Sequence, residues 1–170
     1  MKKLILIVAA LIVAYAANGQ NDVKNVIKVN PLGLLFGTTS LSYERVLTPK
    51  SALQINANYG NIKILGISIS NVGVGADYRL YFSKTKEAPR GFYFAPGAAY
   101  SNVSVENVSG SAFSLSGVAG YQWVWKSGFE LDLYLGPQYT FGGELNSGGT
   151  NYAQFSGFGP KLGVSIGYGF

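Results

Sequence analysis

The sequence predicts an all-β fold, an eight-stranded antiparallel up-and-down transmembrane β-barrel, from three observations. After residue 25, apolar residues alternate with small or polar ones through nearly the whole chain, and this period of two is typical of β-strands. Segments rich in Gly, Ser, Asn and Pro interrupt the alternation at intervals that suit successive hairpins. Only 12% of the residues are charged while 48% are hydrophobic, so the chain lacks the charges that cover a soluble surface.

The N-terminus has the pattern of a cleaved secretory signal peptide, which we assign to residues 1–19. A basic start precedes the apolar run 4–14, and small residues then allow cleavage after Ala16 or after Gly19. The apolar run is well short of the ~20 residues that a membrane-spanning helix requires. Residues 20–25 form a short N-terminal segment that precedes the barrel.

The barrel domain, residues 26–170, divides into eight strands. The last one shows the alternation most clearly, because from Phe158 to Phe170 every even position is apolar and every odd position is small or polar. An even number of strands returns both ends of the domain to the same side, and the first and eighth strands can then pair to close the barrel. We predict strands at 26–35, 38–47, 52–60, 67–82, 91–105, 112–125, 129–142 and 155–170.

Turn sequences separate these strands and form two sets at opposite ends of the barrel. Gly occurs in both sets and Pro in one of them, as is typical of segments that reverse the chain. One end has the turns 48–51, 83–91 and 126–128. The other end has the connections 36–38, 60–66, 106–111 and 142–154.

The direction of the apolar face distinguishes a membrane barrel from a soluble, lipocalin-like one. Opposite the apolar face the strands carry mostly Gly, Ser, Ala and Asn, which suit the narrow interior of an eight-stranded barrel. On the apolar face, aromatic residues gather near both strand ends with aliphatic residues between them, as in the girdles of membrane barrels. The girdle residues are Phe82, Phe92, Phe94, Trp123 and Trp125 at the short-turn end, and Tyr59, Tyr100, Phe113, Tyr139 and Phe141 at the other.

The same alternation directs seven charged residues into the lumen. Charges in an enclosed space are stabilised only when they are paired and hydrogen-bonded, so we expect ion pairs such as Lys28 with Glu44. The pairs can form either a plug or a gated polar channel, and the narrow bore of eight strands favours the plug. The seven residues are Lys28, Glu44, Asp77, Arg79, Glu130, Asp132 and Lys161.

The composition excludes several classes of function. The chain has no His and no Cys, which excludes a Ser-His-Asp triad, a Cys nucleophile, a zinc finger and a disulfide. We therefore predict no enzymatic activity, no catalytic residue, no cofactor and no metal site, with the neighbouring carboxylates Glu130 and Asp132 as the alternative for acid–base chemistry. The formal net charge is only +5 and the basic residues are scattered, which excludes nucleic acid as a partner.

The C-terminal strand, with alternating apolar residues that end on a terminal Phe, resembles the small outer-membrane β-barrel proteins of the OmpA/OmpX type. Met1-Lys2-Lys3 with Asn18-Gly19-Gln20, and the segment 42–47, are similar to secreted barrels from Bacteroidetes-like bacteria. The resemblance implies a porin-like architecture in the outer membrane of a Gram-negative bacterium, with both termini in the periplasm. It also implies a signal that the barrel assembly machinery reads during biogenesis. That signal corresponds here to Lys161, Gly163, Ile166, Tyr168 and Phe170.

We therefore expect a monomeric outer-membrane β-barrel of the cell envelope with a closed polar lumen and a structural or surface-binding role. Its expected partners are outer-membrane lipid, the barrel assembly machinery and, as a candidate, another envelope protein. Two alternatives remain. The chain can be a subunit of a larger envelope assembly, or a soluble lipocalin-like carrier of small molecules.

Overall fold

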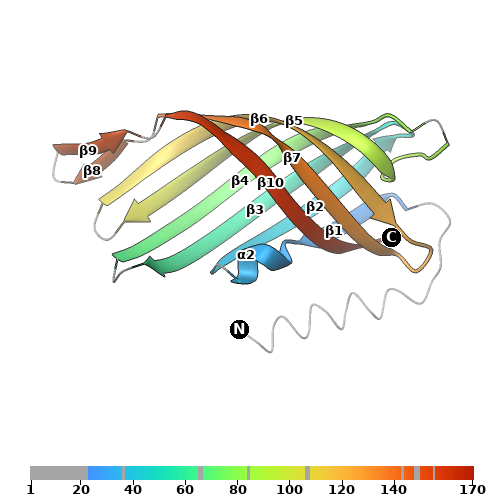
Figure 1. Cartoon of the computed structure of the whole chain (residues 1–170), viewed down its shortest axis with the longest axis horizontal. Coiled ribbons are helices and arrows are strands. Elements are labelled where there is room, and N and C mark those ends of the chain that lie inside the picture. The colour runs from blue at the N-terminus through green and yellow to red at the C-terminus, as the bar shows by residue number, and fades with distance from the viewer. Residues whose placement is uncertain are drawn as a thin grey trace.

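The predicted all-β, eight-stranded antiparallel up-and-down barrel is confirmed (Figure 1). Consecutive strands pair as hairpins, and the first and last strands pair with each other to close the sheet. The predicted signal peptide, residues 1–19, lies outside the described part of the chain. The computed structural model describes residues 23–35, 37–64, 67–83, 85–105, 108–142, 144–147, 150–154 and 156–170.

Eight strands form the barrel wall, and their order around it follows the chain. Closure comes from β1 and β10, where Lys28 lies opposite Gly167 on one side and opposite Ser42 of β2 on the other. The strands are β1 (Asn25–Val29), β2 (Thr38–Thr48), β3 (Ser51–Ile64), β4 (Ile67–Tyr81), β5 (Gly91–Val105), β6 (Val108–Val124), β7 (Phe129–Phe141) and β10 (Gly157–Gly169).

The prediction of a first strand over 26–35 was wrong in its second half, which is the helix α2 (Pro31–Leu35). Asn30 caps this helix, since its Oδ1 accepts a hydrogen bond from the Gly33 backbone N–H at 3.0 Å. Pro31 occupies the first helical position, where its missing N–H costs nothing. Gly37 follows the helix with a φ of 74°, a backbone conformation that glycine adopts without strain. Helix α2 contacts both β2 and β10, and so lies in the wall above the short β1.

The connection predicted at 142–154 contains a further hairpin, β8 (Glu144–Ser147) and β9 (Thr150–Gln154). Its two strands pair with each other, and Asn146 pairs with Ser109 of β6. In Figure 1 this hairpin extends beyond one end of the barrel. The third and sixth strands are also longer than predicted at this end, because β3 continues to Ile64 and β6 begins at Val108.

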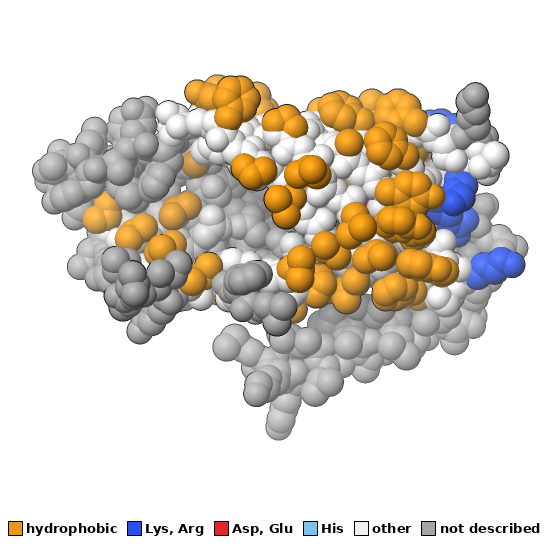
Figure 2. All heavy atoms as spheres, viewed as in Figure 1, with side chains coloured by type: hydrophobic (Ala, Val, Ile, Leu, Met, Phe, Trp, Pro, Cys, Tyr) orange, Lys and Arg blue, Asp and Glu red, His pale blue; other side chains and the backbone are white. Residues whose placement is uncertain are grey.

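The apolar faces of the strands point outward. Leu135, Leu162 and Val74 are 61%, 63% and 58% exposed. Figure 2 shows hydrophobic side chains spread over the outer surface of the barrel, with Lys and Arg side chains gathered at one end. The interior at the short-turn end is packed instead by small side chains and two tyrosines, among them Ala52, Ala95 and Tyr93, each 0% exposed.

Glycines on the inward face make room for the large interior side chains. A Cβ at Gly120 would lie 2.5 Å from the ring of Tyr93, and a Cβ at Gly163 would overlap the hydroxyl of Tyr134. Only glycine therefore allows two tyrosine rings into so narrow a lumen. No helix within the described residues is long and apolar enough to cross a membrane.

Candidate functional site in the barrel lumen

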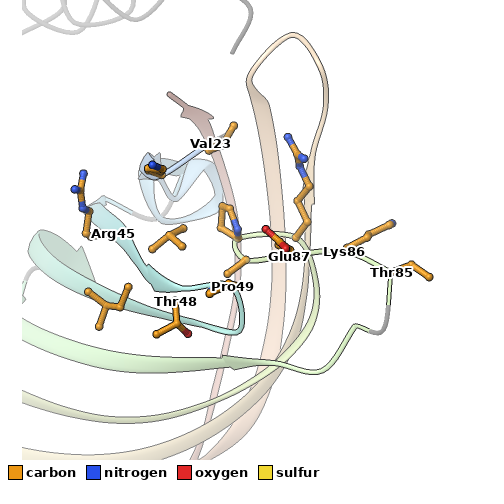
Figure 3. Close-up of a pocket in the computed structure, with 13 residues that line it drawn as sticks. Val23, Arg45, Thr48, Pro49, Thr85, Lys86 and Glu87 are labelled. Atoms are coloured by element: carbon orange, nitrogen blue, oxygen red, sulfur yellow. The ribbon is translucent and has the colours of Figure 1, made fainter. Parts of the chain in front are cut away.

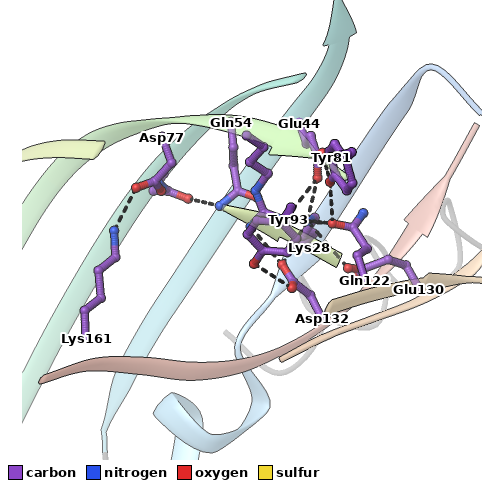
Figure 4. Close-up of polar contacts among 12 residues, drawn as sticks. Lys28, Glu44, Gln54, Asp77, Tyr81, Tyr93, Gln122, Glu130, Asp132 and Lys161 are labelled. Carbon is purple, nitrogen blue, oxygen red and sulfur yellow. Dashed lines mark hydrogen bonds and ion pairs between the residues drawn. The ribbon is translucent and has the colours of Figure 1, made fainter. Parts of the chain in front are cut away.

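All seven charged residues predicted to face the lumen lie there. Lys28, Glu44, Glu130 and Asp132 are 0–1% exposed, because their strand positions share the inward parity and larger neighbours enclose them. Asp77 and Arg79 of β4 are 5% and 3% exposed, and the Lys161 side chain is 24% exposed. Figure 4 shows these side chains converging from several strands in two groups.

The first group, which we call the charge network, is centred on Lys28 of β1. The Lys28 Nζ lies 2.6 Å from Glu44 Oε2, 3.2 Å from Asp132 Oδ2 and 3.5 Å from Glu130 Oε1. It also donates a hydrogen bond of 2.8 Å to Gln122 Oε1. One cation from β1 therefore joins carboxylates of β2 and β7, which are strands on both sides of the closure.

Arg79 is the second cation of the charge network. Its Nη2 lies 2.8 Å from Asp132 Oδ2 and its Nη1 lies 3.6 Å from Glu44 Oε2. Nη1 also donates to Gln122 Oε1 at 2.7 Å, and the guanidinium lies 4.3 Å from the centre of the Tyr93 ring. Arg79 thus connects β4 to the acids across the lumen.

Three uncharged residues complete the network, and the sequence analysis did not single them out. Tyr81 donates a hydrogen bond of 2.6 Å to Glu44 Oε1, and Tyr93 donates one of 2.8 Å to Asp132 Oδ1. The third residue is Gln122, whose Oε1 accepts from both cations. Strand alternation in the sequence indicates that these side chains point inward. Tyr93 follows Phe92 and Gln122 precedes Trp123, and both of those aromatic residues were predicted to face outward.

The charge network contains one more carboxylate than cation. Lys28 and Arg79 face Glu44, Glu130 and Asp132 at the distances given above. Glu130 is the least well held, because neither of its oxygens has a hydrogen-bond partner among the described residues. Within the described part of the chain, Lys28 is the one cation that forms an ion pair with it, at 3.5 Å.

The second group lies nearer the loop end and joins Asp77 to Lys161. Lys161 Nζ lies 2.8 Å from Asp77 Oδ1 and donates to Ser116 Oγ at 3.1 Å. Asn56 donates to Asp77 Oδ2 at 2.6 Å, and Gln54 donates in turn to Asn56 Oδ1 at 2.7 Å. Of these residues, Gln54, Asn56, Asp77 and Lys161 line a cavity of about 240 Å³, and Asn, Ser and Gln side chains are the most frequent in its other walls.

The two groups differ in their access to solvent. The side chains of the charge network are 0–3% exposed and occupy the lumen at the short-turn end. The carboxylates of Glu130 and Asp132, the candidate acid–base pair, are both 0% exposed, so a dissolved substrate does not reach them in this conformation. The described residues include no group of acids, histidines or cysteines arranged to hold a metal ion.

The predicted girdle residues lie on the outer surface at the two ends of the strands. Phe82, Phe92 and Trp125 are 59%, 51% and 44% exposed at the short-turn end. Tyr59 and Phe141 are 58% and 45% exposed at the other. Of the remaining girdle residues, Phe94, Tyr100 and Phe113 are exposed, while Trp123 and Tyr139 are partly covered.

The residues of the predicted assembly signal occupy both faces of β10. Lys161 points inward to Asp77, and Gly163 is buried beside Tyr134. Tyr168 is only 9% exposed, whereas the alternation predicted an outward, exposed ring. The reason is that the ring lies against Gly128, where a side chain would overlap it. Phe170 remains on the surface at 38% exposure.

A protein-family model matches most of the chain. No curated protein matches the chain. A family model described as "Protein of unknown function (DUF3575)" matches residues 4–145. Because this match covers more than half of the 170 residues, the chain belongs to that family.

Proposed function

We propose that this protein is an outer-membrane β-barrel of the OmpA/OmpX type, with a closed polar lumen and a structural or surface-binding role rather than a catalytic one. One observation carries the proposal. The barrel is inverted relative to a soluble protein, with Leu135 and Leu162 61% and 63% exposed while Glu44 and Asp132 are 0% exposed. In water such a surface would aggregate, whereas in a bilayer it is the surface that hydrocarbon solvates.

The distribution of aromatic contacts supports the same proposal. At the short-turn end Trp125 and Phe129 have ring centres 5.3 Å apart. At the loop end Phe113 packs with Phe141 at 6.1 Å, and Tyr139 with Phe158 at 4.8 Å. Paired aromatic clusters at two heights suit the two interfaces of a membrane, where such rings are favoured.

The strand lengths also suit a membrane span. Seven of the eight wall strands have 11 to 17 residues, and β1 has 5. About 9–11 residues cross a bilayer when a strand is tilted. In the proposed orientation the termini and short turns face the periplasm, and the hairpin β8–β9 faces outward. The charge network then serves as a plug in the periplasmic half of the lumen.

The experiment that tests this proposal is fractionation of cells that express the full chain, followed by gel electrophoresis of heated and unheated samples. We expect the protein in the outer-membrane fraction, with an unheated band that migrates faster than the heated one, because a closed barrel resists unfolding by detergent. Recovery in the soluble fraction without detergent would contradict the proposal and favour a soluble carrier.

The alternative role as a subunit of a larger envelope assembly is favoured by the hairpin β8–β9. Among the described residues, β9 pairs only with β8, so its other edge has no neighbouring strand. An unpaired edge can accept a strand from a partner. The same membrane fraction, extracted in a gentle detergent and analysed by size, separates the two roles, since co-purifying chains favour the subunit.

A further inference from the structure

A second cavity, of about 530 Å³, lies at the short-turn end of the barrel (Figure 3). We call it the basic pocket. It lies between the start of the described chain, the turn between β2 and β3, and the turn between β4 and β5. Its only acidic lining residue is Glu87, and its basic lining residues are Lys24, Arg45, Lys86 and Arg90. In the view of Figure 3, Arg45 and Lys86 lie on opposite sides of Glu87.

Contacts with neighbouring residues hold two of the four basic side chains of the pocket, Arg45 and Lys86, in place. Arg45 Nη1 donates a hydrogen bond of 2.6 Å to Asn25 Oδ1, which also accepts one of 2.7 Å from the Tyr43 hydroxyl. Lys86 Nζ donates to the Tyr121 hydroxyl at 3.2 Å. The Nε of Arg90 is enclosed and has no hydrogen-bond partner among the described residues.

The turn between β4 and β5 is also fixed against the neighbouring turn. The Ala88 backbone N–H donates to Pro49 O at 2.9 Å, and Lys50 Nζ donates to the carbonyl oxygens of Ser83 and Lys86. The pocket is therefore a built feature of the fold. Its lining has four basic residues and one acidic residue, a formal charge of +3 that favours an anion over a cation.

The position of the pocket indicates which anion it suits. Arg45 and Leu47 share the outward face of β2, and both line the pocket. Leu47 is 53% exposed and continues into the apolar outer surface. A ligand with a negative headgroup and an apolar chain can therefore contact the cations and the adjoining surface together.

We propose that the basic pocket binds the phosphate group of an anionic phospholipid in the membrane leaflet at the short-turn end. This inference rests on the proposed function, because it requires the outer surface to lie in a bilayer. Arg45 and Arg90 supply guanidinium groups, which match phosphate oxygens in geometry. The acyl chain lies along the surface that includes Leu47.

The test is native mass spectrometry of the intact barrel in lauryldimethylamine oxide micelles with equal amounts of phosphatidylglycerol and phosphatidylcholine. We expect the wild-type barrel to retain one phosphatidylglycerol and to prefer it about fivefold over phosphatidylcholine. A preference of about this size is expected when one cation lies near an anionic headgroup. The double variant Arg45→Gln, Arg90→Gln should lose this preference. Lys126→Gln, which removes a charge at the same end but outside the pocket, should keep it.

The other outcomes of this experiment overturn the inference. Equal retention of the two lipids in wild type refutes a site that selects an anionic headgroup, and an equal loss in Lys126→Gln shows a general effect of surface charge. Sodium phosphate is then added to the sample. If inorganic phosphate, identified by its mass, binds in place of lipid, the pocket is a site for a soluble anion. Heat-modifiable mobility of each variant on a gel shows that its barrel is folded. A failure of lipid binding therefore does not contradict the proposed membrane location, which the fractionation experiment tests separately.

Discussion

At the scale of single residues, Lys28 is the side chain on which the charge network depends most. Replacing Lys28 by Met leaves Glu44, Glu130 and Asp132 in the buried lumen with Arg79 as the only network cation. Removing one partner of a buried ion pair typically costs ~3–5 kcal/mol, because the remaining charge is desolvated without compensation. We expect the free energy of unfolding of Lys28→Met, measured by urea titration of the barrel in detergent, to fall by about that amount.

Two further variants separate this effect from a general loss of charge. Lys126→Met, in an exposed turn, should change the free energy of unfolding by less than ~0.5 kcal/mol. The double variant Lys28→Met, Glu130→Gln removes a carboxylate that has no hydrogen-bond partner in the described chain and should recover part of the loss. A Lys28→Met barrel as stable as wild type would contradict the central role of this lysine.

The sequence predicted which charged residues enter the lumen but not how they pair. Parity along a strand determines whether a residue such as Asp132 points inward. It does not give the height at which residues of distant strands meet, because that depends on the stagger of the closed barrel. For this reason Lys28 with Glu44, on neighbouring strands, was predicted, whereas Arg79 with Asp132 and the role of Gln122 were not.

At the scale of elements, the helix α2 is where the sequence prediction of the wall failed. The period of two is weak over 30–35, and Asn30-Pro31 followed by Gly37 is a helix start and stop that strand reasoning does not use. A five-residue helix has little stability of its own, so its caps and its contacts with β2 and β10 hold it in the wall.

The capping hydrogen bond of α2 gives a prediction at this scale. Asn30→Ala removes the acceptor that lies 3.0 Å from the Gly33 N–H, and the expected loss is about 1 kcal/mol in the free energy of unfolding. Asn30→Ser keeps a capping oxygen and should lie within a few tenths of a kcal/mol of wild type. Urea titration in detergent measures both, and equal losses in the two variants would show that the cap contributes nothing.

At the scale of the whole molecule, the prediction from sequence was most complete. Eight alternating segments with turns at two ends leave few arrangements except a closed meander, because an open sheet would expose two unpaired edges. The hairpin β8–β9 was missed because its residues lie within a segment rich in Gly and Asn that reads as a loop. The closure of the barrel, the number of its strands and the outward direction of its apolar face follow from the alternation of apolar and polar residues. The hairpin β8–β9 at the loop end depends instead on local contacts.

The buried charge network leads to a prediction about ion conduction. Its side chains are 0–3% exposed and come from β1, β2, β4, β5, β6 and β7, so they meet across the lumen. We expect wild-type barrel in planar bilayers to give no large, steady single-channel currents, because each ion would have to displace paired charges. Arg79→Ser removes the longest side chain of the charge network and should introduce measurable single-channel openings. Lys161→Gln, whose side chain lies beside the cavity nearer the loops, should give no such openings. Steady currents from the wild-type protein would show that the lumen is a channel rather than a plug.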